Sequence, residues 1–243
     1  MFDLFTIMKN KGFKKYVNSE EFDSFSANLL YTKLKSLSEN KKKISIALSG
    51  GLTPLPILSK LKNYNLDWEK FFFFMVDERN VSIESSLSNY GNIKKALFSK
   101  IKSSSYPMLN KDLSLGDSVI EYEELLKRSV SLNEKKIPVF DLIILGMGDD
   151  GHTASLFPNT KGLDERSKLV IKNWIPQINQ FRITITFPVI LNADQILLLV
   201  KGEVKKKILN EINEGFGQNY PICEIFESHA NITSVIGVNK NEN

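Results

Sequence analysis

The side chains best suited to acid–base chemistry lie in residues 139–158, VFDLIILGMGDDGHTASLFP. An apolar run typical of a buried strand ends there in a glycine-rich turn that contains Gly148, Asp150 and His152. His152 is one of only two histidines, and imidazole is the side chain that exchanges a proton near neutral pH. An α/β enzyme places its chemistry at such a strand end. We therefore expect Asp150 and His152 to form an acid–base pair in an active site.

Three other chemistries fit this turn less well. Residues 146–151 match G-x-G-x-x-G, but Pro158 cuts the next helix short and no acidic ribose ligand stands ~20 residues on. The chain has no H-E-x-x-H motif for a metal hydrolase and no G-x-S-x-G motif for a serine nucleophile. Cys223 is the only cysteine, which excludes an internal disulfide and a cysteine-built zinc site. We expect neither a metal nor a cofactor.

A second glycine turn is suited to binding an anion. Ser49, Gly50 and Gly51 follow a short apolar strand pattern, and Thr53 and Pro54 are a natural N-cap and first residue of a helix. A helix entered through glycines presents free backbone N–H groups and the positive end of its dipole. The local features fit a phosphate or carboxylate cradle and a simple β-to-α turn equally well.

Charged residues follow the other apolar strands as well. Asp77 and Arg79 come directly after a run of phenylalanines, Arg182 begins an alternating strand, and Lys205 lies on a helix after another strand. Such residues are usually solvated loop charges. However, the carboxyl ends of parallel strands meet at one crevice in an open α/β sheet. These cations and the cradle then favour a small phosphorylated metabolite, with His152 activating water or transferring a proton.

Strand and helix patterns alternate along the chain, which predicts one doubly wound, mostly parallel, Rossmann-like sheet in a single α/β domain over residues 1–243. We expect a strand or arm at the start and polar loops at 82–92 and 159–167. The expected strands are 44–48, 71–76, 139–145, 168–172, 182–187, 194–200 and 233–238, and the expected helices are 22–37, 54–61, 93–98, 119–132 and one carrying Lys205.

The composition excludes several classes of partner. The 243 residues carry a net charge of +4 and are 42% hydrophobic, as in an ordinary globular protein. The basic clusters Lys9–Lys15, Lys41–Lys43 and Lys205–Lys207 lack the aromatic residues of a nucleic-acid surface. No apolar run approaches the ~20 residues of a membrane span, and the first residues lack the order of a secretory signal. We expect a cytoplasmic monomer or weak homodimer with a small-molecule substrate.

Four segments, taken in order, resemble the 6-phosphogluconolactonases. They are LSGGLTP, VDERNV…SN, GMGDDGHTASLFP and RITITFPVILNA…GEVKKKIL, and the resemblance runs from about residue 44 to 209. These enzymes belong to the sugar-phosphate isomerase/deaminase/CoA-transferase-like superfamily. The sibling glucosamine-6-phosphate deaminases typically have Asn-Glu-Pro and Asp-Glu-Tyr where this chain has Leu156-Phe157-Pro158 and Asp77-Glu78-Arg79, which favours the lactonase.

The resemblance implies hydrolysis of 6-phosphoglucono-1,5-lactone to 6-phosphogluconate, the second step of the oxidative pentose phosphate pathway. It implies His152 as the general base, Asp150 as the group that orients it, and Arg79 as a substrate ligand or a stabiliser of negative charge. A deaminase or isomerase on the same scaffold and a non-catalytic sugar-phosphate sensor are the alternatives. The residues implied to bind the substrate or its phosphate are Ser49, Gly50, Gly51, Thr53, Asp77, Gly148, Arg182 and Lys205.

Three residues depart from the pattern of the family. Leu52 stands where Ser or Thr is usual, which removes a hydroxyl from the phosphate turn, and Ser82 replaces a proline. Asn159 replaces a glycine, and asparagine is the residue best able to adopt the positive φ expected there. None of the three changes alters Asp150, His152 or Arg79.

Overall fold

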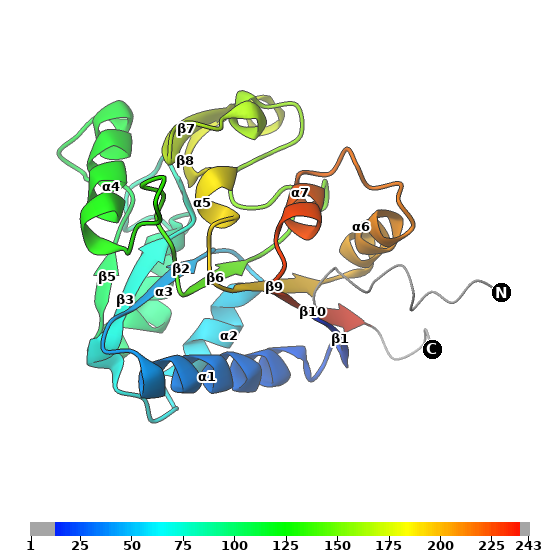
Figure 1. The fold of residues 1–243 in the computed structure, drawn as a ribbon, viewed down its shortest axis with the longest axis horizontal. Coiled ribbons are helices and arrows are strands. Elements are labelled where there is room, and N and C mark those ends of the chain that lie inside the picture. The colour runs from blue at the N-terminus through cyan, green and yellow to red at the C-terminus, as the bar shows by residue number, and fades with distance from the viewer. Residues whose placement is uncertain (1–12, 239–243) are drawn as a thin grey trace.

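The computed structural model describes residues 13–238 and is built on a seven-stranded sheet (Figure 1). Every pair of neighbours in this sheet is parallel, so the expected mostly parallel central sheet is confirmed. Its central strands are buried on both faces, which explains their largely apolar sequences. In spatial order the strands are β1 (Phe13–Asn18), β10 (Ile232–Val238), β9 (Ile196–Lys201), β6 (Leu142–Leu145), β2 (Ile44–Leu48), β3 (Phe71–Met75) and β5 (Ser104–Tyr106).

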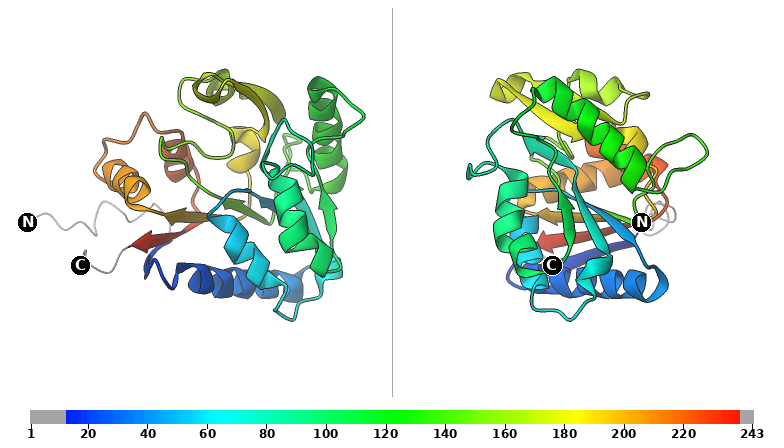
Figure 2. Two further views of the ribbon diagram at one scale, coloured as in Figure 1. Left: turned by 180° about the vertical axis from the view of Figure 1, so that it is seen from behind. Right: turned by 90° about the vertical axis from the view of Figure 1, so that its left-hand side faces the viewer.

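Helices cover both faces of this sheet. The two views in Figure 2 and the view in Figure 1 place α1 and α2 on one side and α4 and α5 on the other. Four short 3-10 turns, η1 to η4, complete the described part of the chain. The helices are α1 (Phe22–Asn40), α2 (Pro54–Leu61), α3 (Asn89–Ala96), α4 (Leu115–Ser129), α5 (Phe187–Ile190), α6 (Glu203–Asn213) and α7 (Pro221–Ser228), and the turns are Trp68–Lys70, Phe98–Lys100, Lys161–Asp164 and Pro176–Ile178.

A second, three-stranded antiparallel sheet was not expected. It consists of β4 (Asp77–Arg79), β8 (Gln180–Ile185) and β7 (Val170–Ile175), with β8 in the middle. The predictions that 168–172 and 182–187 belong to the main sheet are therefore wrong, and residues 77–79, expected directly after a strand, form a strand of their own. Strands β7 and β8 contain both buried and exposed residues, which suits a sheet with one exposed face, whereas the central strands of the main sheet are buried on both faces.

Val76 joins the two sheets. Its backbone N–H donates to the carbonyl oxygen of Leu48 at the end of β2, at 2.9 Å, and its own carbonyl accepts from Ile185 of β8, at 3.0 Å. The chain thus passes from β3 of the large sheet directly into β4 of the small one. Because Val76 is fully buried, these two hydrogen bonds are shielded from water and hold the small sheet against the strand ends of the large one.

The start of α3 and the cap of α2 differ from expectation. Helix α3 begins at Asn89 rather than at residue 93, because Ser88 caps it by accepting a hydrogen bond from Gly91 N at 2.9 Å. The loop expected at 82–92 is correspondingly shorter. Thr53 and Pro54 stand where α2 begins, as predicted, but the Thr53 side chain makes no capping hydrogen bond.

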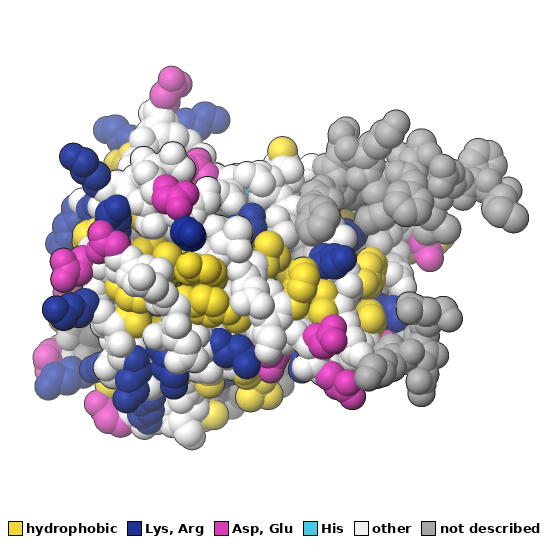
Figure 3. Space-filling view, turned by 90° about the horizontal axis from the view of Figure 1, so that it is seen from below, with side chains coloured by type: hydrophobic (Ala, Val, Ile, Leu, Met, Phe, Trp, Pro, Cys, Tyr) yellow, Lys and Arg dark blue, Asp and Glu magenta, His cyan; other side chains and the backbone are white. Residues whose placement is uncertain are grey.

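Asn159 has φ 59°, which confirms the left-handed conformation foreseen for it. Cys223 is buried against the core, as a small apolar residue would be. Figure 3, which views the molecule from the side of α1, shows basic side chains interspersed with acidic and apolar ones. Residues 1–12, and with them part of the Lys9–Lys15 cluster, lie outside the described residues. Among those described, no helix is both long and apolar enough to cross a bilayer.

Asp141, the one charged residue in the run 139–145, has a structural role. It is buried, and its Oδ2 accepts from the backbone N of Ser45 at 2.6 Å and from its hydroxyl at 2.8 Å, while Lys41 forms an ion pair with Oδ1. Removal of this carboxylate leaves buried donors without an acceptor.

We expect Asp141→Ala to lower the free energy of unfolding by about 2–3 kcal/mol, measured by urea denaturation. Asp112→Ala is the matched control because Asp112 is exposed, and its effect should stay within about 0.5 kcal/mol. Equal effects of the two substitutions would contradict the structural role of Asp141.

Candidate active site

A cavity of about 510 Å³ opens where β2, β3, β6 and β9 end. The predicted site residues converge on it from the turns and helices that follow these strands and from the small sheet. Of the predicted residues, only Asp150 is not part of the lining, and it contacts His152, which is. The predicted residues that line the cavity are Ser49, Gly50, Gly51, Thr53, Asp77, Arg79, Gly148, His152, Arg182 and Lys205.

His152 and Asp150 form the expected pair. Nδ1 of His152 lies 2.6 Å from Oδ1 of Asp150, and the same oxygen accepts from the backbone N of His152 at 3.1 Å. Burial alone raises the pKa of Asp150, but the hydrogen bonds from His152 and its charge outweigh this effect and hold that pKa below its ordinary value. The ionised carboxylate favours the tautomer with hydrogen on Nδ1, which leaves Nε2 as the atom able to accept a proton.

Two residues hold the imidazole ring in place. Phe157 stacks on it with 3.7 Å between ring centroids and 19° between the planes. On Gly148 a Cβ would overlap the ring of His152, so this position requires glycine. The ring is thereby restricted, while the His152 side chain keeps 26% of its surface exposed. A proton can therefore pass between the ring and a molecule in the cavity.

Arg79 and Arg182 form a paired cationic surface on the small sheet. They are directly opposite each other in the antiparallel ladder of β4 and β8, so their side chains leave the same face. Burial lowers the pKa of Arg182, and the charge of Arg79 adds to this effect. Nε of Arg182 is buried and has no hydrogen-bond partner. An anion between the two guanidinium groups would relieve both the repulsion and the unmet hydrogen bond.

The acidic residues beside Arg79 serve the fold. Oδ2 of Asp77 accepts from the hydroxyl of Ser155 at 2.7 Å, which fixes the orientation of a carboxylate that also lines the cavity. Glu78 is buried and accepts from the backbone N–H groups of Asn89 and Tyr90 at the start of α3. Burial raises its pKa, and those backbone donors oppose the rise.

The turn after β2 has the geometry of an anion cradle. Gly51 adopts φ +102°, which favours glycine, and a Cβ on Gly50 would overlap the amide of Asn89. The hydroxyl of Ser49 is buried without a hydrogen-bond partner, directly in the cavity wall. Leu52 is 93% exposed at the cavity mouth. The turn therefore offers backbone donors and one unpaired hydroxyl.

Lys205, on α6, lines the cavity together with Arg79 and Arg182. Its side chain is 21% exposed, and Nζ lies 3.7 Å from Oδ1 of Asp149, which is itself largely exposed. Asp149 is one of several lining residues that the sequence predictions missed. All of them except Ile178 lie in the segments that carry the family resemblance, but none was assigned a role. The missed residues are Pro54, Asn89, Gly146, Met147, Asp149, Thr153, Ala154, Phe157 and Ile178, with Leu52 known only as a departure from the family.

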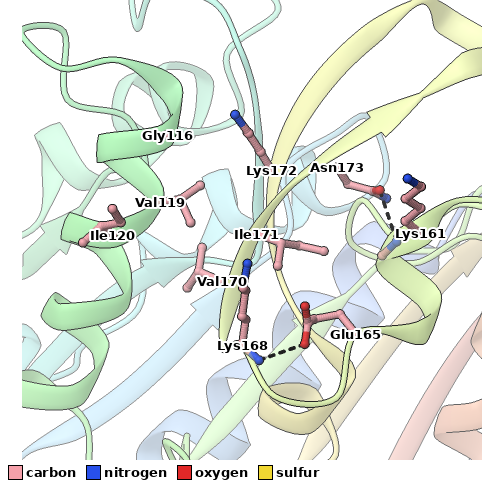
Figure 4. A pocket seen from close by; sticks show the side chains of 11 residues that line it. Gly116, Val119, Ile120, Lys161, Glu165, Lys168, Val170, Ile171, Lys172 and Asn173 are labelled. Carbon is pink, nitrogen blue, oxygen red and sulfur yellow. Dashed lines mark hydrogen bonds between the residues drawn. The ribbon is translucent and has the colours of Figure 1, made fainter.

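A second cavity, of about 390 Å³, lies between α4, β7 and residues 161–168 (Figure 4). It shares no lining residue with the first and contains none of the predicted site residues. Its one carboxylate, Glu165, accepts from the backbone N–H groups of Ser167 and Lys168, which lower its pKa to about 2. Across residues 13–238, no three His, Cys, Asp or Glu side chains gather as a metal site.

Comparisons with known proteins agree with this arrangement. Residues 18–234 match the family described as glucosamine-6-phosphate isomerases/6-phosphogluconolactonase. A 6-phosphogluconolactonase of Chlamydia pneumoniae is 39% identical over 190 residues, 73% of this chain and 69% of that protein. The one of Thermotoga maritima is 34% identical over 200 residues, 81% of this chain and 87% of that protein. A crystal structure of a 6-phosphogluconolactonase from Thermotoga maritima has a TM-score of 0.82 at 29% identity, with 94% of this chain and 100% of that chain covered. The chain therefore belongs to the glucosamine-6-phosphate isomerase/6-phosphogluconolactonase family.

Proposed function

We propose that the protein hydrolyses 6-phospho-D-glucono-1,5-lactone to 6-phospho-D-gluconate, the second step of the oxidative pentose phosphate pathway. The observation that carries the proposal is that an oriented imidazole and three cations face one cavity. The relatives named 6-phosphogluconolactonase support the choice of substrate. Because the family also includes glucosamine-6-phosphate isomerases, an amino-sugar phosphate is the alternative substrate to test.

The phosphate is held by the cations and the turn after β2. Arg182 and Lys205 supply charge, and the backbone N–H groups of residues 50–53 supply donors at the helix N-terminus. The buried Nε of Arg182 and the hydroxyl of Ser49 each gain a partner on binding. Anchoring the phosphate fixes the lactone in the cavity, so that its carbonyl carbon is presented to the base without a further loss of freedom.

His152 acts as the general base. Nε2 takes a proton from a water molecule as its oxygen forms a bond to C1 of the lactone, and Asp150 stabilises the imidazolium that results. Arg79 stabilises the negative charge that develops on the carbonyl oxygen. The C1–O5 bond then breaks, and the proton on Nε2 passes to O5. The products are a free hydroxyl and a carboxyl group, which loses its proton to solvent at neutral pH.

His152→Ala should reduce kcat by ~10²–10⁴-fold because it removes the general base. Acid release from freshly made 6-phosphogluconolactone, corrected for spontaneous opening, measures the rate. Binding of 6-phosphogluconate, measured by calorimetry, should persist because the phosphate ligands remain.

His229→Gln provides the control for the loss of a histidine, since His229 is buried, bonds to the carbonyl of Ala193, and lies outside the cavity. An unchanged rate in His152→Ala would contradict the assignment of the base. Release of ammonia from glucosamine 6-phosphate by the wild-type protein would identify a deaminase instead.

Lys205→Ala should raise KM more than it lowers kcat, because Lys205 contributes charge to phosphate binding and takes no part in proton transfer. Loss of one charge-assisted hydrogen bond corresponds to about a tenfold or greater rise in KM. Lys207→Ala is the matched control on the same helix, since Lys207 is exposed and pairs with Glu211. A normal KM for Lys205→Ala would remove this residue from the phosphate site.

A further inference from the structure

Asn89 lines the cavity at the start of α3, although the sequence predictions gave it no role. Its backbone and its side chain each bond to a neighbour on β4. The backbone N–H of Asn89 donates to Oε1 of Glu78 at 2.7 Å, and its Nδ2 donates to the carbonyl oxygen of Asp77 at 3.0 Å. A carbonyl oxygen only accepts hydrogen bonds, so the amide nitrogen must face Asp77. The position of the amide oxygen, Oδ1, is fixed as a consequence.

Oδ1 of Asn89 lies against the turn after β2. A Cβ built on Gly50 would overlap this oxygen and the amide carbon, so the side chain packs directly on the glycine backbone. No described residue donates a hydrogen bond to Oδ1, whereas the other polar groups of Asn89 are bonded. Asn89 as a whole is 4% exposed. The structure thus contains a rigid acceptor in the cavity wall that lacks a donor.

A sugar lactone needs acceptors as well as cations. Its phosphate is recognised by donors, but each of its secondary hydroxyls has a hydrogen to give. Arg79, Arg182 and Lys205 cannot accept that hydrogen. One oxygen of the Asp77 carboxylate, Oδ2, accepts from Ser155. Oδ1 of Asn89 has no donor among the described residues, so it is a side-chain acceptor of the cavity wall that is available to a hydroxyl.

We propose that Oδ1 of Asn89 accepts a hydrogen bond from one secondary hydroxyl of the bound lactone and so selects substrates that carry this hydroxyl. The assignment rests on the proposed lactonase activity and adds a specificity-determining residue to it. A site that is built to bond a hydroxyl discriminates against the analogue that lacks it, because the polar group of the site is then left unpaired.

The test is a cycle of Asn89→Ala against the 2-, 3- and 4-deoxy analogues of 6-phosphogluconolactone. We expect the substitution to lower kcat/KM on the complete lactone about 5- to 10-fold, the effect of one neutral hydrogen bond. One of the three analogues should lose about the same factor with the wild-type enzyme and nothing further with the variant. For the other two analogues, Asn89→Ala should lower kcat/KM by the same factor as it does for the complete lactone.

Asn92→Ala is the matched control, since Asn92 lies on the same helix outside the cavity and its Nδ2 donates to the carbonyl oxygen of Ser86 at 2.8 Å. It should not change the ratio of rates between the lactone and any analogue. Asn89→Ser, which suits the start of a helix, replaces Asn89→Ala if thermal denaturation shows that the latter does not fold.

A purely structural role for Asn89 would lower the rates on all four compounds by the same factor, and that result would overturn the proposal. So would unchanged rates in the variant. Failure of the wild-type protein to accelerate opening of the complete lactone would refute the proposed function itself, together with this assignment, and is recognised before any variant is measured.

Discussion

The passage of the chain from one sheet into the other at Val76 is the constraint on which the site depends. The turn after β2 carries the anion cradle, and β8 carries Arg182, yet the two segments are more than 130 residues apart in sequence. Val76 bonds to Leu48 on one side and to Ile185 on the other. Two buried backbone hydrogen bonds therefore set the position of the cradle relative to the arginine pair, and neither depends on a flexible side chain.

Two unmet hydrogen bonds lie where a ligand can meet them. In residues 13–238, five buried side-chain polar atoms lack a partner, and two of these, Oγ of Ser49 and Nε of Arg182, belong to residues that line the cavity. Each such atom costs about 1–3 kcal/mol in the empty protein. In the neighbouring buried carboxylate of Glu78, in contrast, both oxygens accept hydrogen bonds. The fold satisfies the groups that support the site and leaves unsatisfied those that a phosphate would contact.

Much of this arrangement could be predicted from the sequence, because strand ends that carry glycines and charges must meet at one edge of a parallel sheet. That rule places His152, Lys205 and the cradle together without any knowledge of side-chain contacts. The rule does not predict the small sheet, because the sequence patterns of β7 and β8 identify them as strands without showing which sheet they join. Phe157 and Asn89 were missed for a related reason: stacking and packing partners depend on the tertiary fold. The single domain, the oligomeric state and the cytoplasmic location stay predictions.

The exposure of Leu52 clarifies what its departure from the family means. The sequence suggested the loss of a phosphate ligand, but this side chain points into solvent at the mouth of the cavity. A hydroxyl there would compete with water, in which hydrogen bonds to a phosphate contribute little. The hydroxyl of Ser49 and Nε of Arg182 are buried in the cavity wall, where fewer water molecules compete. Under the proposed function, phosphate affinity depends on these inner donors, and an apolar residue at position 52 is compatible with an anion cradle at this turn.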